Sequence, residues 1–213
     1  MSTTSLIKMQ VTVDNEMHVA ATALIPVDIN DIEMKNNFLT ESYDATFSRH
    51  DTAFLIDYII KTHHSFAKRN TIIIYNLIQK VTYRHSYQHP ELKKFIEVAF
   101  CFFQDLLNQM IKEEEYIFPG ISEAIKDKKT NSNAVALQGL KQQITLQLAE
   151  HKKTLNYLKV FREITNDYQI PCDASWHYIS LFEKMKELEN DLSKHFHLED
   201  EILYNAIIQR LLK

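Results

Sequence analysis

Glycine and proline are scarce, since the 213 residues contain only two glycines and four prolines. A sheet protein of this length needs many tight turns, and most such turns take glycine at positive φ. The shortage therefore argues against sheet architectures and favours long helices joined by a few loops. An all-α fold is the first expectation.

Cysteine is equally scarce. Cys101 and Cys172 are far apart in the sequence and form no CxxC pair. Their spacing excludes a zinc knuckle or a dithiol redox centre within this chain and fits a reducing compartment. Any metal is then expected to be held by histidine and carboxylate.

Long apolar runs and strong charge are also missing. No stretch approaches the roughly 20 apolar residues of a membrane span, and the N-terminal segment lacks the basic region and apolar run of a secretory signal. The net charge of −4 is mild, and the basic residues are scattered rather than clustered, which argues against nucleic acid. We expect a cytoplasmic protein with neither a membrane nor a nucleic-acid partner.

The chain is predicted to divide near residue 50. Residues 1–50 show little periodicity and are expected to form a short appendage, with one helix around 30–46. Beyond them, apolar residues recur at helical spacing, and four long helices with short connections predict an up-down-up-down four-helix bundle over 51–213. The predicted helices run from Asp51 to the polar run at Tyr83, from 90 to a break at Phe118-Pro119-Gly120 or on to 127, over 133–166, and from Asp173 almost to Lys213.

Each predicted helix carries polar residues inside its apolar stripe. At 1.5 Å per residue, these groups fall roughly 24–36 Å from the same end of an alternating bundle, so we expect them to form one layer. His197 and Asp200 are predicted to face elsewhere. The polar members of the stripes are His64, Gln109, Glu113, His151, His195 and Glu199, and their apolar neighbours include Ile60, Leu148, Leu155 and Ile202.

Burying an unpaired imidazole or carboxylate costs several kcal/mol, so these groups need mutual partners or an ion. Imidazole and carboxylate without sulfur suit iron, manganese or zinc, and carboxylates from two helices can bridge two ions. A di-iron carboxylate centre inside a helical bundle would satisfy this pattern.

Simpler explanations exist for each residue alone. A single histidine on an apolar face is more often a hydrogen-bonded core residue, and His195 with Glu199 alone fits an ordinary i,i+4 pair. The run of acids from Glu113 to Glu115 is typical of a solvated face. Polar residues occur at one level in all four apolar stripes, and this coincidence favours the metal site. Several other histidines are predicted to be surface or loop residues; they are His85, His89, His177 and His197.

Six segments together resemble a known family. The run from about 54 to 204 is similar to the hemerythrin-like domain of the iron-sulfur cluster repair di-iron proteins, the RIC family, and covers about 70% of the chain. The last segment is close to a family signature. The segments are FLIDYIIKTHH at 54–64, HPEL at 89–92, QMIKEEEYIFP at 109–119, AEHKKTL at 149–155, REITNDY at 162–168 and NDLSKHFHLEDEILY at 190–204.

The resemblance implies a non-haem di-iron centre with four histidines and two bridging glutamates. Its histidines fall on His64, His151 and His195, and its bridging carboxylates on Glu113 and Glu199. The fourth histidine falls on Gln109, because the family pattern HMxxEE is QMIKEE here. The second metal position is therefore altered. The cysteine pair that many members carry near the N-terminus is also missing from residues 1–50.

The function implied by the resemblance is recovery of iron-sulfur proteins from nitrosative or oxidative stress. It includes iron donation and the binding or reduction of nitric oxide, with damaged iron-sulfur proteins and a small diatomic ligand, NO or O2, as partners. Two alternatives stay open. One is a hemerythrin-like protein that binds or senses oxygen, nitric oxide or iron at an altered or mononuclear site without turnover; the other is a metal-free interaction module.

Overall fold

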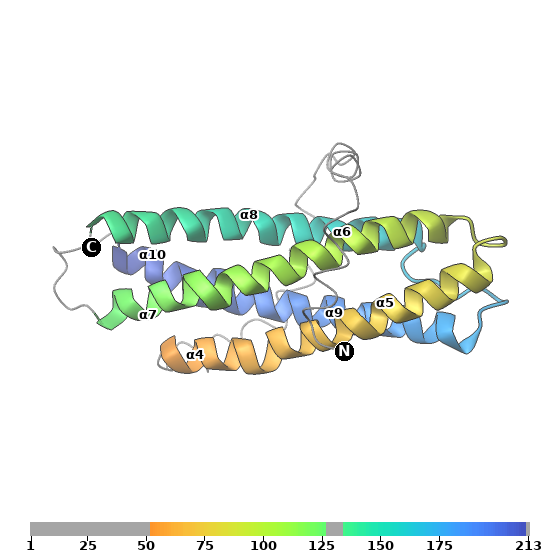
Figure 1. The fold of residues 1–213 in the computed structure, drawn as a ribbon, viewed down its shortest axis with the longest axis horizontal. Helices are drawn as coiled ribbons and strands as arrows, with labels where there is room; N and C mark the ends of the chain where they lie inside the picture. Colours follow the sequence, from red (N-terminus) through yellow and green to blue (C-terminus); the bar gives the residue numbers. More distant parts are fainter. Residues whose placement is uncertain (1–51, 127–133, 212–213) are drawn as a thin grey trace.

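Four helical arms run up, down, up and down through the computed structural model, which describes residues 52–126 and 134–211 (Figure 1). Their arrangement confirms the all-α fold and the four-helix bundle. The proposed division near residue 50, the appendage and its helix around 30–46 lie outside the described residues, so they stay predictions.

Three of the four arms contain a stretch of π-helix. The first arm consists of α4 (Thr52–Tyr58), the π-helix η1 (Ile59–His64) and α5 (Ser65–His85). The second consists of α6 (Glu91–Lys112), the π-helix η2 (Glu113–Ile117) and α7 (Phe118–Lys126). The third is α8 (Ala134–Ile164), and the fourth consists of α9 (Trp176–His197), the π-helix η3 (Leu198–Tyr204) and α10 (Asn205–Leu211).

Of the two predicted ends of the second helix, the break at Phe118-Pro119-Gly120 is wrong and the extension is confirmed, because the second arm continues through α7 to Lys126. Pro119 lies just after the π-helix η2 and lacks the backbone N–H that would continue the hydrogen bonding from η2 into α7, yet the arm is not interrupted there. Gly120 does not form a turn but allows two helices to pack closely. A Cβ atom added to it would lie 3.2 Å from Leu140 Cδ1 of α8, so the absence of a side chain lets α7 approach α8.

The π-helices also shift which residues face inward. We predicted Ile60 and Ile202 in the buried stripes, but Ile59 and Leu203 are buried instead, while the two predicted residues are only half-buried. A π turn inserts one extra residue into the helical repeat, so the inward face moves by one position.

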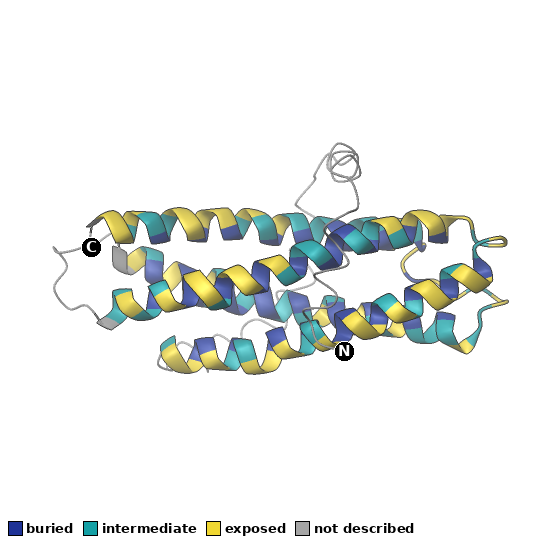
Figure 2. Ribbon diagram, viewed as in Figure 1, coloured by how far each residue is buried: buried dark blue, intermediate teal, exposed yellow. Residues whose placement is uncertain are grey.

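The buried face of α8 also differs from the prediction. Leu148 and Leu155 are half-buried, whereas their polar neighbours Gln147 and Thr154 are buried. This helix contains no π turn, so the difference lies in its rotation: it turns its polar residues toward polar partners on the other arms. Buried and exposed residues alternate along every arm as expected for amphipathic helices (Figure 2).

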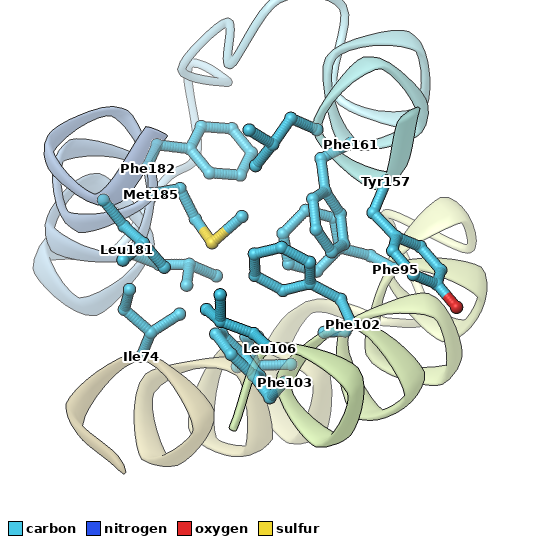
Figure 3. Packing of buried hydrophobic residues seen from close by; sticks show 14 of the residues in the cluster. Ile74, Phe95, Phe102, Phe103, Leu106, Tyr157, Phe161, Leu181, Phe182 and Met185 are labelled. Carbon is cyan, nitrogen blue, oxygen red and sulfur yellow. The ribbon is translucent and has the colours of Figure 1, made fainter. Parts of the chain in front are cut away.

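Two apolar clusters fill the bundle. The larger, here called the aromatic cluster, packs Phe95, Phe102, Phe161 and Phe182 together with Met185 and aliphatic residues of α5, α6, α8 and α9 (Figure 3). The smaller apolar cluster includes Ile59, Phe118, Ile144 and Leu203 and lies toward the opposite end. In each arm the polar stripe residues lie close to the point where members of one cluster give way to members of the other, so apolar packing borders the predicted layer on both sides.

The end of the bundle beyond the aromatic cluster carries the α5–α6 turn and the α8–α9 loop, at the right of Figure 1. His85 was predicted to lie at the surface, but it is buried, and its Nε2 lies 2.9 Å from Ser175 Oγ. His89 joins the same two connections through Asp173. None of the described helices has the length and apolar character needed to cross a bilayer.

Candidate metal centre

The structure brings five of the six predicted residues into one buried layer. His64 ends η1, Glu113 begins η2, His151 lies midway along α8, His195 is near the end of α9 and Glu199 lies in η3. The exposed fraction of each is 1% or less. We call these five residues the polar layer.

Four members of the polar layer form the tighter group. Atoms of His64, Glu113, His195 and Glu199 that can ligate a metal all lie within 4.8 Å of one another. The Nε2 atoms of the two histidines are 3.0 Å apart. Glu113 Oε2 lies 3.2 Å from His64 Nε2, and Glu199 Oε1 lies 3.0 Å from His195 Nε2. These four atoms define the first half of the layer.

His151 faces the other oxygens of the same carboxylates. Its Nε2 lies 3.0 Å from Glu113 Oε1 and 3.3 Å from Glu199 Oε2. Each carboxylate therefore turns one oxygen toward the pair of imidazoles and the other oxygen toward His151. This is the orientation that carboxylates need in order to bridge two cations.

Carboxylates behind two of the imidazoles fix their orientation. Glu114 Oε1 accepts a hydrogen bond from His64 Nδ1 at 2.6 Å, and Asp200 Oδ1 accepts one from His151 Nδ1 at 2.7 Å. With Nδ1 as the donor, the neutral ring turns the lone pair of Nε2 into the layer, as expected for a ligating histidine. The prediction that Asp200 faces elsewhere is wrong, and Glu114 is not part of a fully solvated face. Both are about one quarter exposed and reach inward.

The donor set fits a cation because several buried atoms have no hydrogen-bond partner. They include both oxygens of Glu199 and Oε2 of Glu113. A buried carboxylate oxygen without a partner is costly, and these oxygens face imidazole nitrogens in the same layer. A cation held between them would compensate the carboxylate charge.

The raised pKa values of two histidines reflect the negative charge of the carboxylates around them. Burial alone lowers the pKa of His64, but its hydrogen bond to Glu114 and its close contacts with the carboxylates of Glu113 and Glu199 outweigh burial and raise that pKa to about 11. For His151, burial is likewise outweighed by hydrogen bonds to Asp200 and Glu113, and the pKa rises to about 10. Protons on these rings balance the carboxylates, and a cation would displace them.

Glu114 is held as an anion. Its hydrogen bond with His64, supported by Lys68 Nζ at 2.7 Å, outweighs burial and lowers its pKa to about 2. It therefore supplies a fixed negative charge behind His64 at neutral pH. Lys68 balances this charge at the surface of the bundle.

Gln109 is the predicted residue that the structure does not bring into the layer. Its side chain is buried, but Nε2 donates to Thr154 Oγ1 at 2.8 Å and to the Glu150 carbonyl oxygen at 3.2 Å. Thr154 Oγ1 in turn donates to Gln109 Oε1 at 3.2 Å. Both ends of the amide are therefore bonded to α8.

Three residues next to the layer were missed. Gln147 is buried one turn before His151, and its Nε2 lies 2.6 Å from Glu113 Oε1. The hydroxyl of Tyr204 lies 3.4 Å from the same oxygen. His63 stacks on His195 with ring centroids 5.6 Å apart. The i,i+4 spacing of Gln147 and His151 was a usable signal, but a rule that prefers apolar residues in the stripe selects Leu148.

His63 is anchored on the side away from the layer. Its Nδ1 lies 3.0 Å from Asp191 Oδ1 on α9. The ring is thereby fixed against His195, which sits one turn further along α9. This contact joins the first and fourth arms beside the polar layer.

Comparison with known proteins gives a consistent picture. Residues 55–207 match the model of the family described as Hemerythrin HHE cation binding domain. The chain is 24% identical to the iron-sulfur cluster repair protein ScdA of Staphylococcus haemolyticus, over 73% of this chain and 67% of that protein. It is also 24% identical to the repair protein DnrN of Neisseria gonorrhoeae, over 72% of this chain and 89% of that protein.

A third relative is the iron-sulfur cluster repair protein YtfE of Escherichia coli O81. The identity is 24%, over 71% of this chain and 64% of that protein. The match thus spans about two thirds of the length of the Staphylococcus and Escherichia relatives and most of the Neisseria one.

Proposed function

Because the chain belongs to the hemerythrin HHE cation binding domain family, we propose that its polar layer holds a non-haem di-iron centre that serves the repair of iron-sulfur proteins. The observation that carries the proposal is the orientation of two buried carboxylates. Glu113 and Glu199 each turn one oxygen toward His64 and the other toward His151. This arrangement suits two cations bridged by carboxylates.

The chain's own residues would have distinct roles at such a centre. His64 and His195 would hold one ion and His151 the other, while Glu113 and Glu199 would bridge them. When bound, the iron would supply electron transfer and an open position for a diatomic ligand. Glu114 and Asp200 keep the Nδ1 protons of two rings in place, and the apolar clusters on both sides limit the entry of water.

The proposed biological role follows from the relatives. Three of them are named iron-sulfur cluster repair proteins. By analogy, the chain would act in the cytoplasm during nitrosative or oxidative stress, with damaged iron-sulfur proteins as partners. Iron donation and the binding or reduction of NO are the two activities proposed for the centre.

A second candidate function is binding or sensing without turnover. One observation favours it: the residue that stands in place of a histidine, Gln109, directs its amide to Thr154 and the Glu150 carbonyl. The position facing His151 then has a weaker set of ligands than the one between His64 and His195. Such a protein would bind oxygen, nitric oxide or iron and release it unchanged.

The test starts from protein purified without oxygen. Iron content and visible absorption are measured before and after addition of nitric oxide, with Glu199→Ala as the control. A working centre gives bound iron and a spectrum that responds to the gas in the wild type only. The absence of iron from the wild type, with thermal stability unaffected by chelation, would contradict the proposal and support a metal-free interaction module.

A second experiment, with a damaged iron-sulfur enzyme as the partner, distinguishes repair from sensing. Iron-loaded protein is mixed with an iron-sulfur enzyme whose cluster has been destroyed by nitric oxide, and recovery of that enzyme's activity is followed. Repair predicts faster recovery with the wild type than with Glu199→Ala. Gas binding without any difference in recovery would support the sensing function instead.

A further inference from the structure

The two halves of the polar layer are unequal. The half around His64 and His195 contains two imidazoles and one oxygen from each of Glu113 and Glu199. The half around His151 contains one imidazole and the remaining carboxylate oxygens. It lacks a second neutral donor, because Gln109 directs its amide to α8.

A different amide occupies this gap. Gln147 lies one turn before His151 on α8 and is 2% exposed. Its Nε2 atom is 2.6 Å from Glu113 Oε1 and 3.3 Å from His151 Nε2. The amide end of Gln147 therefore lies among the atoms that would surround the second cation.

The distances between these nitrogen and oxygen atoms are those found between neighbouring ligands of one metal ion. Oxygen and nitrogen ligands lie at about 2.0–2.2 Å from a transition-metal ion, which places neighbouring ligand atoms roughly 2.8–3.6 Å apart, with the shorter values for octahedral and the longer for tetrahedral coordination. His151 Nε2 is 3.0 Å from Glu113 Oε1, 3.3 Å from Glu199 Oε2 and 3.3 Å from the Gln147 amide. Only the Gln147 contact to Glu113 is shorter, as a hydrogen bond from an amide to a carboxylate is.

We infer that Gln147 completes the metal position facing His151 through its amide oxygen, in the role that the family resemblance assigns to residue 109. This inference rests on the proposed metal centre. The terminal torsion of a glutamine is broad and roughly two-fold, so a half turn exchanges Nε2 for Oε1 at nearly the same place. Without a cation, the NH2 group donates to Glu113; with a cation, the oxygen faces the ion.

The two metal positions should therefore differ in their affinity for iron. A neutral imidazole is a better ligand for iron than an amide oxygen. The half with His64 and His195 fills first, and the half with His151 and Gln147 fills at higher metal concentration. Loading therefore takes place in two separate steps.

The test is an anaerobic titration of metal-free protein with Fe(II), followed by calorimetry and by metal content per chain. Gln147→Leu removes the amide at similar volume, and Gln109→Leu makes the same change at the other buried amide. Thr154 can then bond the carbonyl of Glu150 one turn back, so the control is expected to fold. Thermal unfolding in chelator checks that both variants do so.

We expect two binding steps in the wild type and in Gln109→Leu. In Gln147→Leu the weaker step loses at least about tenfold in affinity while the tighter step is unchanged. Gln147→Glu, which supplies a charged oxygen at the same position, strengthens the weaker step. This rescue separates a ligand from a residue that only fills space.

Several results would overturn the inference. Unchanged or tighter binding in Gln147→Leu would mean that the amide only donates to Glu113. Loss of the weaker step in Gln109→Leu alone would place the ligand at residue 109. A wild type that saturates with one ion would refute the Gln147 position while leaving a metal centre in place, whereas a wild type that binds none would refute the proposed function as well.

Discussion

The aromatic cluster and the polar layer are built from neighbouring turns of the same arms, yet they differ in backbone and in chemistry. Around the aromatic cluster the arms are regular α-helices, and the buried residues follow the apolar pattern. At the polar layer, three of the four arms change to π-helix, and the buried groups are imidazoles and carboxylates.

The difference separates stability from function. Apolar burial near the aromatic cluster stabilises the fold without any ligand. The polar layer places charged groups where water cannot reach them, which opposes folding unless a cation or protons compensate. The π turns, which are frequent at functional sites, aim Glu113 and Glu199 at the same centre. Changes in the two regions should therefore affect different measurements.

The largest expected effect on stability comes from the aromatic cluster. Phe102 is fully buried and contacts the rings of Phe103, Tyr157 and Phe161. Phe102→Ala should lower the free energy of unfolding by about 3–5 kcal/mol, as measured by denaturant unfolding in chelator. Iron content per folded chain should not change. A loss of iron as large as the loss of stability would show that the two regions are not separable.

Metal removal should give the next largest effect. A cation that binds only the folded state stabilises it by about 2.7 kcal/mol when its free concentration is 100 times Kd. Chelation should therefore lower the Tm of the wild type but not that of Glu199→Ala. The comparison is made by thermal unfolding with and without chelator. Equal shifts in both proteins would indicate metal binding outside the polar layer.

A smaller effect is expected from the carboxylate behind His151. Asp200→Ala removes the acceptor of the Nδ1 hydrogen bond, and loss of such a partner typically lowers metal affinity about 10–100-fold. The loss should fall on the weaker binding step in an Fe(II) titration. Glu201→Ala, at the exposed neighbouring position, is the matched control and should bind as the wild type does.

The smallest effect is expected at the loop end, far from the polar layer. His89 Nε2 lies 2.9 Å from Asp173 Oδ1, and this hydrogen bond raises the pKa of His89 above its ordinary value. A raised pKa favours the folded state while the ring is protonated. This contribution is complete below the unfolded-state pKa of about 6.5 and is lost as pH rises through the higher folded-state value.

His89→Gln should therefore reduce the loss of stability of metal-free protein as pH rises above about 6.5. Denaturant unfolding at several pH values measures the difference, and His177→Gln serves as a control on the same loop end. The same pH dependence in both variants would exclude His89 as its source.

Much of the fold could be predicted because it depends on composition and apolar spacing. The scarcity of glycine and proline predicted the helices, and the repeat of apolar residues predicted their order. The sequence could not decide between a break at Phe118-Pro119-Gly120 and an extension to 127, because the effect of Pro119 depends on the π turn that precedes it. A prediction from regular α-helical periodicity places Ile60 in the buried stripe. It could not show that the π turn buries Ile59 instead.

The site was predictable where a polar residue interrupts an apolar stripe, as His64 and Glu113 do. Gln147 was missed because Leu148 beside it fits the apolar pattern better, and helix rotation depends on contacts across the bundle. Glu114 and Asp200 were missed because their neighbours Glu113 and Glu199 occupy the inward positions. A side chain can reach around from a flanking position, and spacing alone does not show that reach.

The most direct test of the account is the iron content of three proteins purified without oxygen. These are the wild type, His195→Ala and His197→Ala. We predict about two irons per chain in the wild type and in His197→Ala, with the weaker position loaded at sufficient iron, and loss of at least one iron in His195→Ala. No iron in the wild type, or equal losses in both variants, would contradict the assignment of the polar layer as a metal centre.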